Sequence, residues 1–170
     1  IYAFHPMYID LNQLGKMKDK EALAVFEARR QELNALPQID YEAVNNAKRA
    51  YLKVMFQQTG RKVLASDEFK RFFEENEHWL LPYAAFSYLR DLYGTPDFSQ
   101  WPEHTEYKAE EIAALCAPDS SCYEEIAFYY YTQYHLHIQL LDAGNYAREK
   151  GIIFKGDIPI GISRNSVEAW

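Results

Sequence analysis

Apolar and polar residues recur with helical periodicity along most of the chain, so the sequence predicts a mainly α-helical protein. A first helix is predicted from Asp19, a favourable N-cap residue, to Pro37, which ends it. A second begins at Asp40 and closes before Gly60. One face of each predicted helix is apolar, through Leu23, Phe26 and Leu33 in the first and through Tyr41, Val44, Tyr51 and Met55 in the second.

Two more helices are predicted in the middle of the chain. One begins at Ser66, whose hydroxyl can cap it, and the acidic Asp67 and Glu68 that follow complement the helix dipole. In the other we place Pro82 in the first turn, because proline is tolerated there and disrupts a helix interior. This helix has an apolar face formed by Trp79, Tyr83, Phe86 and Tyr93. Residues 93–104 (YGTPDFSQWPEH) are predicted to form a loop from their glycine and proline content.

The last predicted helix has the strongest pattern. The stretch Ser121-Cys122-Tyr123-Glu124 matches a capping box, in which the Ser and Glu side chains each accept from a backbone N–H. The helix can then run to Lys150, and Gly151 is its C-terminal stop. Residues 126–141 (IAFYYYTQYHLHIQLL) are apolar nearly all round, which predicts burial on several sides.

Two irregular stretches flank the predicted helices. Residues 1–15 (IYAFHPMYIDLNQLG) are expected to be extended. At the other end, the apolar run from Ile152 to Phe154 predicts a short buried strand. Helix, glycine and strand form the second half of a βαβ unit, and a parallel strand needs partners that this chain does not supply. We therefore expect the sheet to lie mostly outside this chain, and the start at Ile1 instead of Met also favours a piece of a longer protein.

The composition limits the classes of function. With 170 residues, 48% of them hydrophobic, the chain can form one domain with a core or part of a larger domain. Its 18 Lys+Arg against 25 Asp+Glu give a net charge of −7 without a basic block, which argues against a nucleic-acid partner. No apolar run approaches the roughly 20 residues of a membrane helix and no signal-peptide pattern opens the chain, so no membrane partner is expected.

The two cysteines bear on the redox compartment. Cys116 and Cys122 flank a Pro-Asp-Ser-Ser turn and can form a disulfide, but two reduced thiols in an intracellular protein are the favoured interpretation. A cytoplasmic location is expected on the same ground.

No metal or cofactor site is predicted. His135 and His137 lie two residues apart in the last predicted helix, so their side chains point about 200° apart and cannot share one ion. Glu75 and His78 match Glu-x-x-His, but a di-iron bundle needs a second copy and two more glutamates. A weaker hypothesis is a metal–carboxylate bundle. The sequence has no glycine-rich phosphate loop and no nucleophile elbow.

Two further patterns each leave alternatives open. The aromatic residues, including 128–135 (FYYYTQYH), Tyr83, Phe86, Tyr88, Tyr93 and Trp101, are mostly expected in the core. Exposed tyrosine rings, however, also suit sugars, which offer an apolar face and hydroxyls. Asp157 follows the predicted strand, where barrel enzymes carry catalytic groups. It equally fits an aspartate that bonds nearby backbone at the start of a loop.

Four motifs, in order, resemble those of one enzyme family. Residues 5–11 (HPMYIDL) are similar to its Asn-Pro-Leu-x-Ile-Asp-Leu segment, residues 39–48 (IDYEAVNNAK) to Val-Asp-Tyr-x-x-Val-x-x-x-Lys, residues 131–135 (YTQYH) to Phe-x-Gln-[Trp/Tyr], and residues 156–170 (GDIPIGISRNSVEAW) to Gly-Asp-x-Pro-Ile…Ser-x-x-x-Trp. The family is that of the 4-α-glucanotransferases, or amylomaltases, among the glycoside hydrolases. The last motif is closer to the bacterial and plant cytosolic disproportionating branch. His5 stands where the family has Asn.

The resemblance implies a fold. The family has a (β/α)8 TIM barrel with a mainly helical insertion after the second strand. This chain would then be mainly α, a helical insertion subdomain plus one helix-strand unit of an incomplete barrel. Residues 1–18 would be the extended segment after the second barrel strand, 19–118 the helical insertion, and 119–170 the barrel helix and third strand with its loop.

The resemblance also implies the chemistry. The family transfers α-1,4-glucan segments by retaining transglycosylation, in which an Asp nucleophile forms a covalent intermediate and a Glu serves as acid and then base. Both would lie on later strands outside this chain, so the chain alone is expected to be inactive. Asp157 would be a supporting carboxylate, not the nucleophile. The implied substrate-binding residues are Tyr8, Tyr41, Pro159, Ser166 and Trp170.

The same resemblance implies the partners. These would be α-1,4-glucans and maltose, in starch and maltodextrin metabolism, together with the remainder of the chain's own barrel, without cofactor or metal. Without that remainder, we expect the chain to self-associate through uncovered apolar residues: Ile152, Ile153, Phe154, Ile158 and Ile160. The alternative to the enzyme is a stand-alone helical module that binds a protein partner through its aromatic faces.

Overall fold

The protein is built from helices. The structure, a computed structural model, describes residues 2–157 and 159–170, and within these ranges it contains no β-strand. The prediction of a mainly α-helical chain is therefore confirmed. The α-helices are α1 (Lys20–Asn34), α2 (Tyr41–Leu64), α3 (Asp67–Tyr93), α4 (Ala109–Leu115) and α5 (Tyr123–Glu149), and three short 3-10 helices are η1 (Pro6–Tyr8), η2 (Leu11–Leu14) and η3 (Phe98–Gln100).

Three helices begin where the sequence predicted. The side chains of Asp19 and Asp40 accept hydrogen bonds of 2.9 Å from the backbone N–H three residues later, at the starts of α1 and α2. Ser66 Oγ likewise accepts from Phe69 N at 3.2 Å at the start of α3. Each bond satisfies one of the backbone donors that the first turn leaves without a partner.

Two predicted boundaries inside the helices are wrong. Helix α2 runs through Gly60 to Leu64, and a Cβ at Gly60 would lie 2.6 Å from the ring of Phe56, so this glycine permits close packing instead of stopping the helix. The two helices predicted on either side of Pro82 are one continuous α3. Residues before and after Pro82, such as Leu80 and Ala84, are completely buried, and this packing offsets the roughly 3 kcal/mol cost of an interior proline.

The predicted capping box of α5 is also wrong. The N-cap residue is Cys122, which makes no side-chain cap bond, and Ser120 Oγ, not Ser121, accepts from Cys122 N at 3.4 Å. The other end follows the prediction. Gly151 has φ 72° and stops the helix, and Ile152 N donates to Ala147 O at 2.9 Å. Helix α4 was not predicted, since no side chain caps its start.

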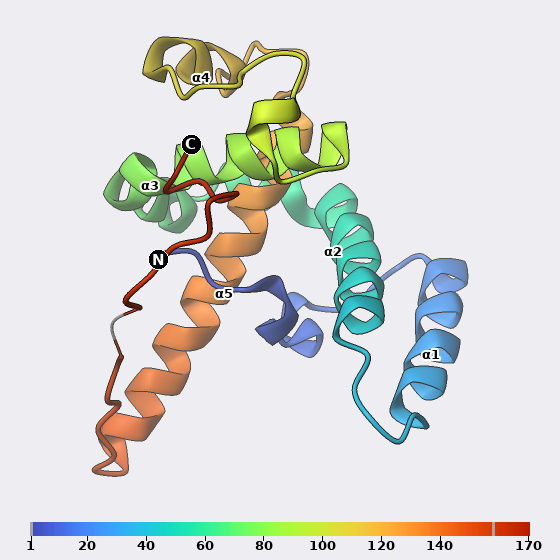
Figure 1. Cartoon of the computed structure of the whole chain (residues 1–170). Coiled ribbons are helices and arrows are strands. Elements are labelled where there is room, and N and C mark those ends of the chain that lie inside the picture. Colours follow the sequence, from blue (N-terminus) through green and yellow to red (C-terminus); the bar gives the residue numbers. More distant parts are fainter. Residues whose placement is uncertain (1, 158) are drawn as a thin grey trace.

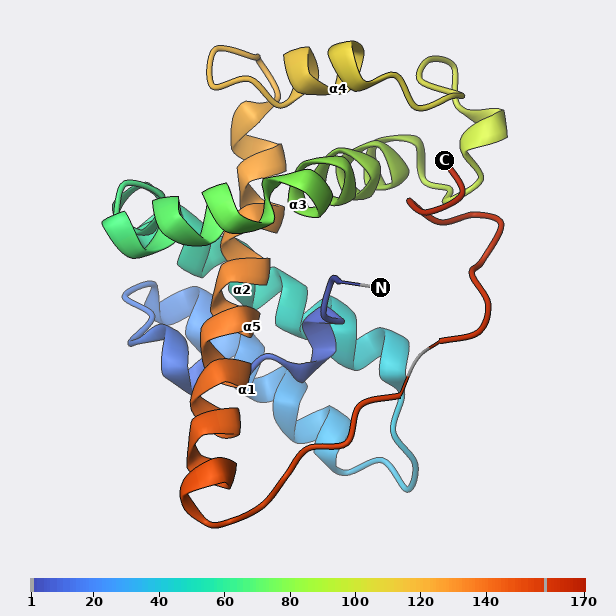
Figure 2. The same cartoon turned by 90° about the vertical axis from the view of Figure 1, so that its left-hand side faces the viewer.

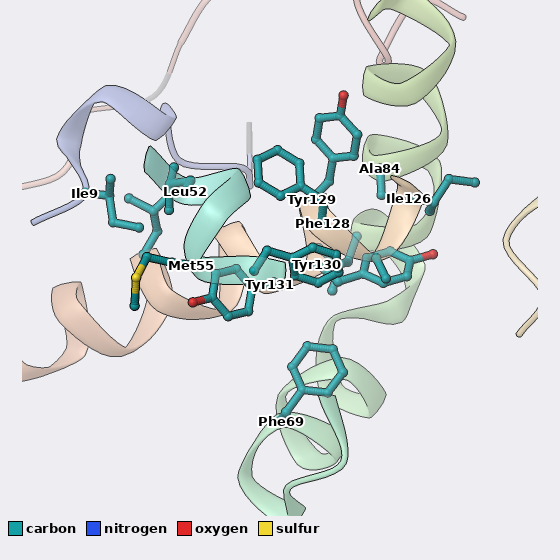
Figure 3. Close-up of a cluster of buried hydrophobic side chains, with 14 of the residues drawn as sticks. Ile9, Leu52, Met55, Phe69, Ala84, Ile126, Phe128, Tyr129, Tyr130 and Tyr131 are labelled. Carbon is teal, nitrogen blue, oxygen red and sulfur yellow. The ribbon is translucent and has the colours of Figure 1, made fainter. Parts of the chain in front are cut away.

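The core forms where α2, α3 and α5 pack together. Residues 126–131 of α5 are all buried, as their apolar pattern predicted, but Leu140 and Leu141 at the end of the predicted stretch 126–141 are exposed. Figure 3 shows Tyr130 and Tyr131 of this stretch near Met55 and Leu52 of α2, with Ile9 from the N-terminal end of the chain beside them. Aromatic rings meet edge to face in this core, for example Phe56 against Tyr131, with ring centroids 5.4 Å apart.

The long helix α5 is the axis of the molecule (Figures 1 and 2). The α1–α2 pair lies on one side of it, α3 crosses near its first turns, and α4 lies over α3. We call residues 2–18 the N-terminal arm; it runs between α5 and α2. We call residues 151–157 and 159–170 the C-terminal tail. It leaves the far end of α5 and returns to α3, where Trp170 packs against Phe86.

The strand predicted at Ile152–Phe154 does not form. These residues are exposed, without regular structure, and Ile153 is 90% exposed. A strand needs a neighbouring strand to bond its backbone, and the described residues offer none. Of the apolar residues expected to be uncovered at this end, Ile160 is also exposed, and Ile158 lies outside the described residues.

Candidate functional site

Two glutamines of α5 bind the backbone of the N-terminal arm. Gln133 accepts from Phe4 N and donates to Phe4 O, both at 2.9 Å. Gln139 does the same at Asp10, accepting at 2.8 Å and donating at 3.0 Å. Because a carboxamide offers one acceptor and two donors, each side chain pairs with a backbone residue as a neighbouring strand would.

Helix α2 holds the arm in a related way. Gln58 accepts from Lys18 N at 2.8 Å and donates to Lys16 O at 2.9 Å. Lys48 Nζ donates to the carbonyls of Met7 at 2.6 Å and Ile9 at 2.8 Å. Burial lowers the pKa of Lys48, and the nearby Asp10 carboxylate partly counters this effect. These side chains thus satisfy part of the polar backbone of the arm, most of which is irregular.

These bonds bring three of the sequence motifs together. Residues 5–11 form the arm's middle, Lys48 ends the second motif, and Gln133 is the glutamine of the third. Their polar members serve to fix the arm on α2 and α5. The sequence marked these residues through the motifs, but no local pattern indicated their partners.

A cavity of about 780 Å³ lies beside the start of the arm. Its walls come from the arm, α3, the loop after α3 and the end of the tail. Six of its lining residues are aromatic: Tyr2, Trp79, Tyr83, Phe86, Tyr107 and Trp170. The polar ones are His78, Ser87, Arg90, Asn165, Ser166 and Glu168. We call it the aromatic cavity.

The arm side of the aromatic cavity is a row of rings. Tyr2 stacks on Trp79 with centroids 6.1 Å apart and an interplanar angle of 24°, and Trp79 lies 6.2 Å from Tyr83. The Tyr83 hydroxyl accepts from Gln133 Nε2 at 3.1 Å. Burial raises the pKa of Tyr83, so this hydroxyl stays neutral. Tyr2 is 62% exposed and Tyr107 is 42% exposed, so both offer ring surface to a ligand.

The tail side of the cavity depends on Trp170. Its ring packs against Phe86 and Tyr107 at centroid distances of 5.6 and 5.5 Å. Its indole Nε1 donates to His104 O at 2.9 Å. His104 has φ 60°, an unusual backbone angle for a residue other than glycine. This conformation orients the carbonyl that receives the Trp170 indole, so the end of the tail is fixed although its middle is exposed.

A charged cluster joins α2, α3 and α5 next to the cavity. Arg49 donates to Asp91 and, at 2.9 Å, to the Tyr129 hydroxyl, and Tyr129 donates to Asp91 in turn. Arg90 Nε donates to the other Asp91 oxygen at 2.9 Å. Burial alone would raise the pKa of Asp91, but the bonds from Arg49, Tyr129 and Arg90 outweigh it and lower the pKa. The cluster therefore stays ionised and connects the three helices.

The structure brings together two of the six predicted site residues. Ser166 and Trp170 line the aromatic cavity. Tyr8 and Tyr41 are exposed elsewhere, on η1 and at the start of α2. Asp157 and Pro159 lie exposed in the tail, away from the cavity.

Sequence reasoning missed other parts of the cavity wall. Tyr2 and Tyr107 were not singled out, because both lie in segments without periodic structure. Only their aromatic character could have marked them.

The two histidines of α5 face different surroundings. His135 is buried, its Nε2 has no hydrogen-bond partner, and burial lowers its pKa to about 4. The His137 ring lies 4.9 Å from that of Phe72. Among the described residues, no group of three or more His, Cys, Asp or Glu side chains is placed to hold a metal ion. Both Cys116 and Cys122 are free thiols.

The arrangement is suited to binding more than to bond cleavage. Exposed ring faces flanked by serine, asparagine, arginine and carboxylate side chains match a ligand with flat apolar faces and hydroxyl edges, as in a chain of pyranose rings. In the part of the chain that the structure describes, each helix is too short or too polar to span a lipid bilayer.

Comparison with known proteins gives a consistent result. The family model for 4-alpha-glucanotransferase matches residues 1–170. The chain is 39% identical to the 4-alpha-glucanotransferase DPE2 of Oryza sativa subsp. japonica, over 100% of the chain and 18% of the relative. It is 29% identical to the 4-alpha-glucanotransferase of Chlamydia muridarum, over 99% of the chain and 31% of the relative. The chain thus spans less than a third of the length of these relatives, and no solved structure matches it.

Proposed function

Since the chain belongs to the 4-alpha-glucanotransferase family, we propose that it is part of an enzyme that transfers α-1,4-glucan segments between sugar acceptors. The observation that carries the proposal is the family match across all 170 residues. No observation favours a stand-alone helical interaction module. The chain covers 18% and 31% of two relatives, so the complete activity, with starch, maltodextrin or maltose as substrates, is proposed for a longer protein.

The reaction proposed is retaining transglycosylation. A carboxylate nucleophile displaces the leaving sugar and forms a covalent glycosyl-enzyme, while a second carboxylic acid protonates the departing oxygen. That second group then deprotonates the 4-hydroxyl of an acceptor glucan, which attacks the intermediate and releases the enzyme. Both carboxylates are assigned to strands outside this chain, and this chain is assigned to glucan binding and support.

In this proposal the chain supplies the helical insertion and one helix-strand unit of a (β/α)8 barrel. Residues 1–18 follow the second strand, 19–118 form the helical insertion, and 119–170 provide a barrel helix, here α5, and the third strand. The exposure of Ile153 and Ile160 supports this assignment, because strand residues of a parallel sheet are apolar and need partners. The same exposure supports self-association of the chain when the rest of the barrel is missing.

The aromatic cavity is the proposed glucan contact within this chain. The exposed rings of Tyr2 and Tyr107 offer faces for stacking, and Ser166 and Arg90 offer hydrogen bonds to sugar hydroxyls. Tyr8, Tyr41 and Pro159 are proposed to contact glucan only in the complete barrel. A cytoplasmic location belongs to the same proposal and is supported by the free thiols of Cys116 and Cys122.

Asp157 is the proposed supporting carboxylate. A fixed negative charge near the reaction centre stabilises the cationic transition state more than the neutral ground state, and only that difference raises the rate. In the complete enzyme, Asp157→Ala should therefore lower the rate of maltotriose disproportionation by about a hundredfold. Its folding free energy should change by less than about 0.5 kcal/mol, since Asp157 is an exposed residue.

The control is Lys155→Ala, an exposed neighbour in the same tail that should leave the rate unchanged. The 170-residue chain alone should release no glucose from maltotriose. Near-normal turnover of the Asp157→Ala enzyme would contradict the supporting role, and glucose release by the chain alone would contradict the assignment of both catalytic carboxylates to other strands.

A further inference from the structure

The amide oxygen and both amide hydrogens of Gln133 have hydrogen-bond partners. It is 1% exposed, and its single amide group makes three hydrogen bonds. The oxygen accepts from Phe4 N, and the two hydrogens of Nε2 go to Phe4 O at 2.9 Å and to the Tyr83 hydroxyl at 3.1 Å. A carboxamide has two N–H donors, so both are satisfied in a buried position.

The residues that Gln133 binds lead directly to the aromatic cavity. Tyr83 lines the cavity itself. Tyr2 lies two residues before Phe4, and its ring stacks on Trp79, which is the ring next to Tyr83. One amide thus fixes two walls that come from different parts of the chain. Gln133 does not line the cavity, so it can act only through the residues that it holds.

We propose that Gln133 is a positioning residue for glucan binding, because its amide holds the arm and Tyr83 together so that Tyr2, Trp79 and Tyr83 form one aromatic wall. This inference rests on the proposed glucan contact in the cavity. Without the amide, the Phe4 N–H and C=O lose their partners and seek water, so the arm separates from α5 at its start. The exposed Tyr2 then loses its fixed place on Trp79, and a ligand must order it again.

Gln139 provides a matched comparison on the same helix. It binds Asp10 in the same two-bond geometry, but Asp10 lies on the far side of η1 from Tyr2, and neither Gln139 nor Asp10 lines the cavity. Loss of either glutamine leaves one N–H and one C=O of the arm backbone without a side-chain partner. Only the loss of Gln133 should disturb the aromatic wall.

The test is titration of the 170-residue chain with maltoheptaose, followed by tryptophan fluorescence, since Trp79 and Trp170 line the cavity. Gln133→Leu should weaken binding by about tenfold or more, and Gln139→Leu by less than about twofold. Both variants should accelerate hydrogen exchange locally, Gln133→Leu at the Phe4 amide and Gln139→Leu at the Asp10 amide. Circular dichroism should report an intact helical fold for both.

A second variant separates hydrogen bonding from packing. Gln133→Glu keeps the shape but buries a carboxylate, which cannot donate until it is protonated. Binding should be weak at pH 8 and recover several-fold relative to wild type as the pH falls towards 6. This variant also decides the question if Gln133→Leu fails to fold.

Wild-type affinity in a folded Gln133→Leu chain, or a pH-independent defect in Gln133→Glu, would overturn the inference. Absence of saturable binding by the wild-type chain would overturn the proposed glucan contact instead. In that case the Phe4 exchange rates still decide whether Gln133 fixes the arm.

Discussion

The N-terminal arm and the C-terminal tail are similar in sequence character and opposite in structure. Both carry apolar residues and little regular structure. In the arm, Ile9 is 0% exposed, and Leu14 and Met17 are also buried. In the tail, Ile152, Ile153 and Phe154 are exposed, whereas Val167 and Trp170 near its end pack against a second core cluster. Apolar content alone therefore does not decide which segment joins the core.

The difference lies in the backbone. The arm places its N–H and C=O groups against side chains of α2 and α5, through Lys48, Gln58, Gln133 and Gln139. An irregular segment can be buried when its polar backbone is satisfied in this way, because an unpaired buried amide would cost on the order of 1–3 kcal/mol. In the described part of the tail, no glutamine side chain bonds the backbone of Ile152, Ile153 or Phe154. A neighbouring strand, as proposed for the complete barrel, would satisfy it instead.

The sharpest test replaces the same residue type in both regions. Ile9→Ala should lower the free energy of unfolding by about 4 kcal/mol, because it removes buried apolar surface and leaves a cavity. Ile153→Ala should change it by less than about 0.5 kcal/mol, since this side chain is 90% exposed. Urea unfolding followed by circular dichroism measures both. Equal losses in the two variants would remove the distinction between arm and tail.

Acid should destabilise the helix that holds the arm. His135 lies between Gln133 and Gln139 on α5, and burial lowers its pKa from 6.5 to about 4. The unfolded chain takes up a proton below pH 6.5 while the folded chain does not. Stability is therefore highest above pH 6.5 and falls until about pH 4, by a total on the order of 3 kcal/mol.

The measurement is the unfolding free energy of wild type and His135→Leu at pH 7 and pH 4.5. Wild type should lose much more stability than the variant between the two values. The carboxylates that titrate near pH 4 are common to both proteins, so the difference isolates His135. An equal loss in both would show that the buried imidazole does not control the acid response.

The smallest predicted effect on stability compares a glycine at the end of α5 with one in the tail. Gly151 has φ 72° at the end of α5, so Gly151→Ala should destabilise the chain by about 1 kcal/mol through backbone strain. Gly156→Ala, in the exposed tail, should have no measurable effect, since a Cβ there meets nothing within 4 Å. Thermal unfolding compares the two variants. A cost at Gly156 equal to that at Gly151 would mean that the tail is as constrained as the helix end.

Local signals in the sequence were enough to predict most helix starts. Asp19, Asp40 and Ser66 could be predicted as caps because each capping bond joins residues only three positions apart. The local sequence therefore contains both partners of the bond. Pro82 and Gly60 were misjudged for the opposite reason. Their helices continue because surrounding core residues pack on both sides of them, and that packing depends on distant parts of the chain.

The candidate site was less predictable than the fold. Ser166 and Trp170 were identified through a family motif, and the cavity brings them together. Tyr2 lines the same cavity because the start of the arm lies beside α3. This placement depends on the bonds between Phe4 and Gln133, which are 129 positions apart. Such bonds leave no periodic trace in sequence. Asp157, Tyr8, Tyr41 and Pro159 are exposed and lie outside the cavity, so their roles in a site stay predictions.

The separation of those bonded residues has a consequence for the order of folding. The arm is the first described part of the chain to be synthesised, yet Gln133 follows Phe4 by 129 residues. At the 5–20 residues per second typical of ribosomes, the arm waits roughly ten seconds for its partner. During that interval the start of the arm is without its partner on α5, although Lys48 and Gln58 of α2, which bind later parts of the arm, follow by only about 40 positions. Docking of the arm on α5 is therefore a late event in folding, later than its contacts with α2, and in a living cell the undocked nascent segment is a natural target for chaperones that bind exposed apolar peptides.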